Sequence, residues 1–302
     1  LSFLNGIHMI PPAIREAVEN WLSTVQPGHR KIISFSPVSG GSINRAFTIR
    51  TISAGYFIKF NDAARYPGMF EAESKGLEVI RKTACIEVPE VFLCAQAGGF
   101  SFLLMENVTG DNSNKSDFWE DFGRRLASLH RMNAGYFGLD HDNYIGSLRQ
   151  QNTPSDQWVD FLIEKRLQPM ITTALSSGLF TRHDCNSFDS LFRKLKDLIP
   201  AEPPSLLHGD LWNGNFISGK NGQVCLIDPA VYHGHREIDI AMTRLFGGFE
   251  SRFYAAYNES FPLAYGWEER ISLNQLFPLL VHVNLFGGGY VSGVRQVLGQ
   301  YL

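Results

Sequence analysis

Residues 206–216 read LLHGDLWNGNF and residues 226–230 read LIDPA, and these two stretches decide the fold. They place Asp210, Asn215 and Asp228 at the ends of short apolar runs, which we expect to form brief strands. The three polar side chains should therefore converge where a hairpin meets a loop. An ordinary Asx-rich turn between strands is the alternative, because Asn, Asp and Gly are common turn formers.

The residue types in this motif point to phosphoryl transfer. Transfer from Mg·ATP needs a carboxylate that orients the attacking hydroxyl and oxygen ligands that hold the cation. The H-x-D-x-x-x-x-N spacing with a downstream Asp matches the catalytic and metal loops of protein kinases. We therefore predict that Asp210 accepts the proton of the substrate hydroxyl, and that Asn215 and Asp228 hold Mg²⁺.

Two further segments follow the motif, YHGHREIDIAM at 232–242 and LFGGF at 245–249. Together with HGDLWNGNF and LIDPA they resemble the fructosamine kinase (ketosamine-3-kinase) family. This family belongs to the small-molecule kinases of protein-kinase-like fold, with aminoglycoside phosphotransferases and choline kinases. The HGD…N…D pattern alone identifies only the wider group, whereas the Trp and Gly inside the loop and the segments behind it point to the narrower one. The resemblance extends from about Ile10 to the C-terminus.

The spacing of apolar residues predicts short strands in the first third of the chain and helices afterwards. We expect helices at 12–25, 70–81, 116–132, 156–176, 184–198 and from 237 onward, and strands at 31–38, 43–51, 56–60, 91–94, 100–105, 206–207, 216–217 and 224–227. The resemblance implies an α+β, protein-kinase-like fold with two lobes. The lobe with a small antiparallel sheet, which binds the nucleotide, should span 10–106, and the mainly helical lobe, which carries catalysis and the substrate site, should span 107–302.

Lys59 is the one basic residue in an apolar strand, where an edge lysine pointing to water would be the ordinary interpretation. Protein kinases pair such a lysine with a glutamate of the next helix. Glu71, Glu73 and Glu78 compete for that place. Glu73 shares a helical face with the apolar residues at 77 and 80 and matches the family pattern F-x-x-E-x-x-x-L. We predict that Lys59 contacts the ATP phosphates and that Glu73 orients it.

Gly40, Gly41 and Ser42 lie between two predicted strands, where glycines let backbone N–H groups approach phosphates. A simple hairpin turn explains these residues about as well. The resemblance favours a nucleotide loop. It also implies that the backbone of the interlobe strand at Met105 and Glu106 meets the adenine.

The remaining candidates surround the motif. His208 could act as a base, but the family pattern implies that it supports the loop through hydrogen bonds, as Asp239 does from the following helix. The resemblance also implies that the acceptor substrate lies near Trp212, His233 and Glu237. Trp158 and Arg166 are further possible contacts to the substrate, although aromatic residues at such positions more often pack in the core.

Composition agrees with such an enzyme without selecting it. The 302 residues carry a net charge of -3, which gives no reason to expect nucleic acid as a partner. No apolar run reaches the roughly 20 residues of a membrane span, so we expect no membrane partner. The first eight residues lack the features of a signal peptide. The four cysteines are scattered, which favours free thiols and a cytoplasmic location.

These observations together predict an ATP- and Mg²⁺-dependent kinase that phosphorylates a sugar hydroxyl of a ketosamine, meaning a fructosamine or ribulosamine, either free or on a glycated lysine. An aminoglycoside or another small molecule is the alternative acceptor. A catalytically silent nucleotide-binding module is a third hypothesis. The joint presence of Lys59, Asp210, Asn215 and Asp228 argues against it.

Overall fold

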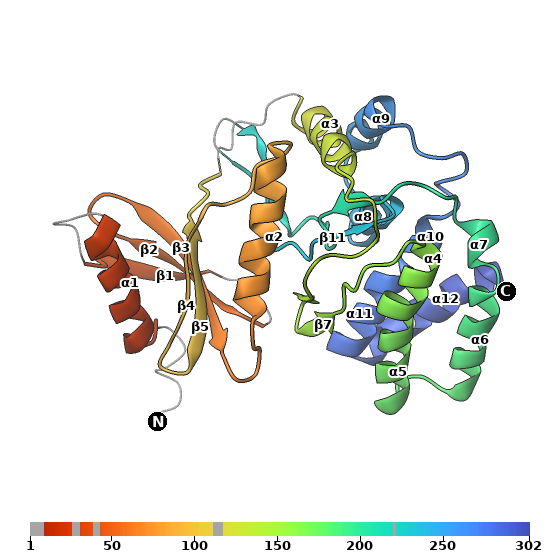
Figure 1. Cartoon of the computed structure of the whole chain (residues 1–302), viewed down its shortest axis with the longest axis horizontal. Coiled ribbons are helices and arrows are strands. Elements are labelled where there is room, and N and C mark those ends of the chain that lie inside the picture. Colours follow the sequence, from red (N-terminus) through yellow and green to blue (C-terminus); the bar gives the residue numbers. More distant parts are fainter. Residues whose placement is uncertain (1–8, 26–30, 39–42, 111–116, 220–221) are drawn as a thin grey trace.

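The computed structural model describes residues 9–25, 31–38, 43–110, 117–219 and 222–302. The predicted nucleotide loop at Gly40, Gly41 and Ser42 lies outside these described residues. Figure 1 shows a sheet with two helices at one end of the molecule and a larger helical part at the other. The first part contains α1 (Pro12–Val25), β1 (Ser34–Val38), β2 (Arg45–Arg50), β3 (Gly55–Asp62), α2 (Met69–Thr83), β4 (Val91–Ala97) and β5 (Phe100–Glu106).

The second part is mainly helical. Its helices are α3 (Phe118–His130), α4 (Trp158–Phe161), the π-helix η1 (Leu162–Leu167), α5 (Gln168–Ser176), α6 (Arg182–Phe192), α7 (Leu195–Leu198), α8 (Glu237–Leu245), α9 (Ser251–Ser260), α10 (Ile271–Asn274), α11 (Leu276–Phe286), the 3₁₀-helix η3 (Gly288–Tyr290) and α12 (Val291–Tyr301). Its short strands are β6 (Asn143–Ile145), β7 (Leu148–Gln150), β8 (Ser205–Leu207), β9 (Phe216–Ser218), β10 (Val224–Leu226) and β11 (Tyr232–Gly234).

The five-stranded sheet is antiparallel in the order β1-β2-β3-β5-β4 and has a helix on each face. Side chains alternate between the faces of a strand. Ile58 and Phe60 of β3 therefore pack with Ile14 and Val18 of α1, whereas Lys59 faces α2. The alternation thus places the one buried lysine of β3 on the side of the sheet that faces the helical part (Figure 1).

Two small pairs of antiparallel strands shape the motif residues. Leu207 of β8 pairs with Tyr232 of β11, and Phe216 of β9 pairs with Leu226 of β10. Residues 208–215 and 227–231 are therefore loops with both ends fixed by strand pairing. An apolar cluster that includes Leu103, Leu206 and Leu226 joins the sheet, α2 and these strand pairs in one core.

The structure and the comparisons below confirm the predicted α+β, two-lobe fold, and the helix at 12–25 agrees with α1. The predicted helix at 156–176 is interrupted by the π-helix at 162–167. Strands β6, β7 and β11 were not expected. The lobe boundary at residue 106 stays a prediction. None of the described helices is long and apolar enough to cross a membrane.

Candidate active site

The loop that follows β8 is held by a buried carboxylate from α8. Asp239 accepts hydrogen bonds from the backbone N–H of His208 at 2.7 Å and of Gly209 at 2.9 Å, and from His130 Nε2 at 3.2 Å. Gly209 has φ +82, and a Cβ there would lie 2.1 Å from the carbonyl oxygen of Ala230. Only glycine therefore allows the two loops of the motif to approach so closely.

His208 connects the same two loops. Its Nδ1 accepts from the backbone N–H of Asp210 at 3.2 Å, and its Nε2 bonds the carbonyl oxygen of Ile227 at 2.9 Å. Because a carbonyl only accepts, Nε2 carries the proton and Nδ1 does not. Burial lowers the pKa of His208, which agrees with this neutral form. Both ring nitrogens are occupied, so His208 is placed as a support of the loop and not as a base.

Asp210 emerges from this support as a partly buried carboxylate. Asn215 Nδ2 donates to Asp210 Oδ2 at 3.0 Å and to the carbonyl oxygen of Asp210 at 2.7 Å. Burial raises the pKa of Asp210 to about 7, helped by the negative charges of Asp228 and Asp239 and opposed by the bond from Asn215. A carboxylate with a pKa near neutrality is suited to accept a proton at physiological pH.

Lys59 joins the sheet to this site. Its Nζ donates to Glu73 Oε1 at 2.8 Å and also to Asp228 Oδ1. Burial alone would lower the pKa of Lys59, but the charges of Asp228 and Glu73 outweigh it and raise that pKa. Burial also raises the pKa of Glu73, against the opposing charge of Lys59. Of the three glutamates considered, Glu73 is thus the one in contact with Lys59, while Glu78 pairs with Lys82 at the surface.

The oxygen atoms of Asn215 and Asp228 fit a magnesium ion. Mg²⁺ is commonly bound by one or two protein oxygens that share it with phosphates and water, and needs no complete protein cage. Among the described residues, no group of three His, Cys, Asp or Glu forms such a cage. The side chain of Asp228 is 47% exposed, so its carboxylate can reach a ligand. Its φ of +55 is unusual for a residue with a Cβ, and such backbone strain is common at active sites.

The end of β5 has the position that the resemblance implies for an adenine contact. Met105 is buried and pairs with Phe57, and Glu106 pairs with Tyr56. The backbone N–H of Glu106 donates to the carbonyl oxygen of Glu90 at 2.7 Å. A nucleotide contact in this strand therefore cannot use that N–H, and the predicted contact to adenine stays a prediction.

The predicted acceptor residues are only partly brought together. Trp212, two residues after Asp210, remains 36% exposed, and its ring centroid lies 6.0 Å from that of Phe246. His233 is buried in β11 next to Tyr136, and its Nδ1 has no hydrogen-bond partner among the described residues. Burial lowers the pKa of His233. Its contact to a substrate stays a prediction.

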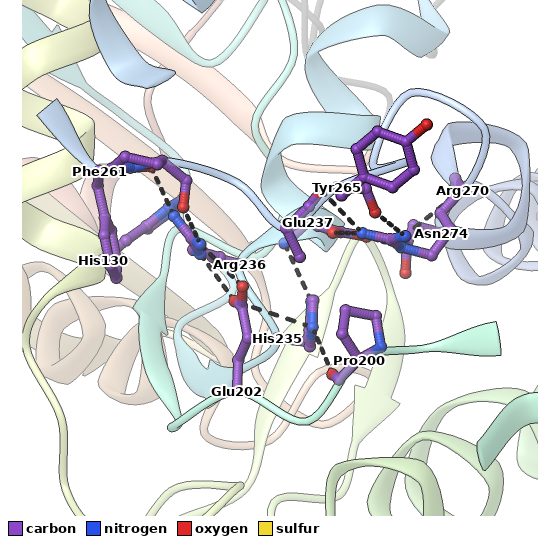
Figure 2. A network of polar contacts seen from close by, with 12 residues as sticks. His130, Pro200, Glu202, His235, Arg236, Glu237, Phe261, Tyr265, Arg270 and Asn274 are labelled. Carbon is purple, nitrogen blue, oxygen red and sulfur yellow. Dashed lines mark hydrogen bonds and ion pairs between the residues drawn. The ribbon is translucent and has the colours of Figure 1, made fainter. Parts of the chain in front are cut away.

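Glu237 is a correction to the sequence interpretation. Figure 2 shows that its carboxylate points toward Arg270 and Asn274. Arg270 Nε donates to it at 2.9 Å and Asn274 Nδ2 at 3.0 Å, and the residue is 1% exposed. A parallel pair in the same figure joins Arg236 and Glu202. Glu237 is therefore occupied in fixing α8 to the helices that follow.

For Trp158 and Arg166 the structure favours packing over contact with a substrate. Trp158 is 5% exposed within the core of the helical part, and Arg166 is completely buried. Burial lowers the pKa of Arg166 to about 10, against the influence of Tyr232. Both side chains therefore pack inside the helical part.

Sequence reasoning missed a row of rings that continues from Trp212. Phe246 lies 4.7 Å from His282, which in turn lies 5.4 Å from Phe286 and 5.1 Å from Tyr290, measured between ring centroids. Phe286 is 53% exposed. The spacing of four residues between His282 and Phe286 is the signal that could have predicted a common helical face, whereas Tyr290 follows in the separate helix η3.

His282 is the polar member of this row. Its Nδ1 bonds the carbonyl oxygen of Pro278 at 2.8 Å and must therefore carry the proton. Burial lowers the pKa of His282, so the ring is neutral at physiological pH and Nε2 is left as an acceptor. The row thus offers one hydrogen-bond acceptor among apolar faces.

Comparisons with known proteins agree with this site. A "Probable ketoamine kinase" of Enterococcus faecium is 37% identical over 88% of this chain and 94% of its own length. A chloroplastic protein-ribulosamine 3-kinase of Arabidopsis thaliana is 34% identical over 95% of this chain and 88% of its own length. The crystal structure of a "Putative fructosamine-3-kinase" from Haemophilus somnus has a TM-score of 0.84 at 29% identity, covering 96% of this chain and 97% of that one.

A more distant likeness concerns the fold alone. An aminoglycoside phosphotransferase structure has a TM-score of 0.60 at 15% identity, covering 94% of this chain and 99% of that one. Residues 14–302, by contrast, match the sequence model of one family throughout. The chain belongs to the fructosamine kinase family.

Proposed function

We propose that this protein is an ATP-dependent kinase that phosphorylates a sugar hydroxyl of a ketosamine. The observation that carries the proposal is the meeting of Asp210 and Asn215 with the Lys59–Glu73–Asp228 cluster in a chain of this family. Kinases of the family use ATP. The arrangement supplies the positioning and charge that phosphoryl transfer requires.

In the proposed reaction the substrate hydroxyl oxygen forms a bond to the γ-phosphorus as the bond from that phosphorus to ADP breaks. Asp210 orients the hydroxyl and takes its proton, for which a pKa of about 7 is suitable. Lys59, held by Glu73, binds the phosphates. Asn215 and Asp228 would hold Mg²⁺, which offsets the phosphate charge when bound.

The acceptor should lie on the row of rings beside Asp210. A ketosamine carries a secondary amine, which is cationic near neutral pH, and several hydroxyls. Aromatic faces such as Trp212 and Phe286 attract a cation, and His282 Nε2 can accept a hydrogen bond from the amine or a hydroxyl. Glu237 is bound by Arg270 and is therefore not available to the amine. The aromatic rings and Asp210 are the groups that support recognition of the amine.

A substrate screen tests the proposal. ATP consumption would be measured with fructosyl-lysine, ribulosyl-lysine, the free ketoses, an aminoglycoside and choline, and the product mass would locate the phosphate. We expect kcat/KM for a ketosamine to exceed that for the matching ketose by about 10² or more, because a site built for the amine is left with unpaired groups by the ketose. Similar values for the free ketose would defeat the ketosamine assignment.

Activity confined to an aminoglycoside would favour the alternative acceptor and leave the kinase mechanism intact. No turnover with any acceptor, combined with normal nucleotide binding, would instead favour a silent module.

The four cysteines are all free, which supports the prediction of a reducing, cytoplasmic location. Whether the ketosamine is free or attached to a protein lysine is tested by adding a glycated peptide to the same screen.

A further inference from the structure

The hairpin of β6 and β7 lies between the two parts of the molecule, beside α2 (Figure 1), and contacts both. Tyr144 donates its hydroxyl to the carbonyl oxygen of Pro67, just before α2, at 2.8 Å. At the turn, Gly146 has φ +56, and a Cβ there would lie 2.7 Å from Leu285 of α11 and 3.4 Å from Ile43, just before β2. The hairpin therefore touches the sheet part at two loops as well as at α2.

The inner side of the hairpin holds the segment that follows the predicted metal ligand Asp228. Asn143 Nδ2 donates to the carbonyl oxygen of Val231 at 2.7 Å. Gln150 Nε2 donates to the carbonyl oxygen of Ala230 at 3.2 Å and to Asn143 Oδ1 at 2.9 Å. Both amide side chains are buried, so these bonds are shielded from competing water.

The hairpin is itself anchored in the core of the helical part. Asn152 Nδ2 donates to Asn143 Oδ1 at 3.1 Å, and Arg166 Nη2 donates to Asn152 Oδ1 at 2.6 Å. Arg166 is completely buried in the π-helix, with its guanidinium 4.0 Å from the ring centroid of Tyr232. A π-helical turn often marks a functional position in a helix. The geometry thus connects a buried cation to Asn143 through one side chain.

The segment formed by Ala230 and Val231 contacts two parts of the candidate site. The N–H of Ala230 donates to the carbonyl oxygen of His208 at 2.8 Å, which ties it to the catalytic loop. On its other side Val231 packs on Gly76 of α2, where a Cβ would lie 3.2 Å from Val231 Cγ2. Gly76 follows Glu73 by three residues, so both lie on one side of α2. A shift of this segment would therefore move Glu73 relative to the catalytic loop.

We propose that the β6–β7 hairpin is a positioning element for phosphoryl transfer. Asn143 and Gln150 hold the segment after Asp228, and Tyr144 holds the start of α2, so that Lys59, Glu73 and Asp228 meet. In protein kinases the matching helix and metal loop are placed by a separately controlled activation loop. Here the fold itself supplies the constraint. The inference rests on the proposed function, because it concerns the geometry of that same site.

Two substitutions test the inference with little change of shape. Asn143→Asp can still accept from Gln150 and Asn152 but loses the donor to Val231 and sets a carboxylate oxygen against its carbonyl. Tyr144→Phe removes the bond to Pro67 and a weaker one that the exposed Arg149 Nε donates to the same hydroxyl at 3.3 Å. Matched controls are the same changes at exposed positions, Asn20→Asp and Tyr265→Phe.

For each protein we would measure kcat and KM with the best ketosamine, the dissociation constant of MgADP, the urea midpoint and the hydrogen exchange of nucleotide-free protein. We expect kcat to fall about tenfold or more in Asn143→Asp, because the buried carbonyl of Val231 loses its donor. In Tyr144→Phe we expect a fall of about fivefold, because the carbonyl of Pro67 that loses its donor is partly exposed. MgADP should bind more weakly, and amides of α2 and residues 230–232 should exchange faster. KM for the ketosamine and the exchange of α11 should stay at parent values, as should every property of the controls.

Parent-like kcat and MgADP affinity in Tyr144→Phe would overturn the inference, and so would faster exchange spread evenly over α2 and α11. If Asn143→Asp does not fold, Tyr144→Phe decides alone. A parent protein without activity on any ketosamine would contradict the proposed function and not the hairpin, because MgADP binding and hydrogen exchange still report on the positioning of α2.

Discussion

The carboxylate of Asp210 should destabilise the folded protein at the pH where it would be active. Its pKa is raised from 3.8 to about 7 in the folded state, chiefly by burial. A raised pKa in an acid means that the folded protein holds the ionised form less well than the unfolded chain does. The penalty is fully present above about pH 7, decreases between about pH 7 and 4, and disappears below the unfolded pKa.

The size of the penalty follows from the same values. A pKa difference of about 3 corresponds to roughly 4 kcal/mol, at about 1.4 kcal/mol for each pKa unit. Asp210 is partly exposed, so solvent screening reduces this, and we expect about 2 kcal/mol. Asp210→Asn keeps the shape and the bond from Asn215 but removes the charge. The variant should therefore be more stable than the parent by about 2 kcal/mol at pH 8 and about equal to it at pH 4.

Urea unfolding of nucleotide-free protein between about pH 4 and 9 measures this difference. Asp189→Asn, at an exposed position of α6, is the matched control and should show no such trend. The same Asp210→Asn variant should lose turnover by a factor of roughly 10² or more, the scale of a general base. A stability difference that does not change with pH, or a variant less stable than the parent at pH 8, would refute the reasoning about Asp210.

Further predictions concern the neighbouring residues. Asp228→Ala should abolish Mg²⁺-dependent turnover, and activity retained at any Mg²⁺ concentration would count against its role. Gly209→Ala should cost at least about 2 kcal/mol more in unfolding free energy than Gly248→Ala, since both have positive φ but only the Cβ at 209 meets a carbonyl oxygen, at 2.1 Å. Glu237→Gln should lower stability by about 2–4 kcal/mol by leaving Arg270 without its charge partner, while KM for the ketosamine stays unchanged. A changed KM with unchanged stability would restore the original assignment of Glu237.

What the sequence predicted correctly about the fold depended on local patterns. Helix α1 was predicted from apolar residues at helical spacing after a proline, and Lys59 was singled out as the one basic residue in the apolar segment that forms β3. Glu73 was chosen from three glutamates because it shares a face with the apolar residues of α2, and it is the one that meets Lys59. In each case the information lies within two or three turns of the residue.

The errors concern side chains whose partners are distant in the chain. A carboxylate at the start of α8, next to the motif, has the sequence features of a substrate contact, yet Glu237 is bound by Arg270, 33 residues later. The strands of β6 and β7 have three residues each and bury Asn143 and Gln150, so they lack the apolar alternation that predicts a strand. Those amides pair with carbonyls 80 and 88 residues away.

The correct predictions and the errors differ for a physical reason, which also applies to the candidate site. An apolar side chain is stabilised wherever it is buried, so its position along the chain already indicates its environment. A buried amide or carboxylate is stable only when a particular partner is in place, and the sequence does not state which one. The position of Asp228 depends on such particular polar partners. Lys59 binds its carboxylate, and Ala230, two residues later, is held by His208 and Gln150. Pro229 restricts φ between them, so the loop that would hold the metal is constrained from both ends and has little freedom to rotate Asp228 out of the site.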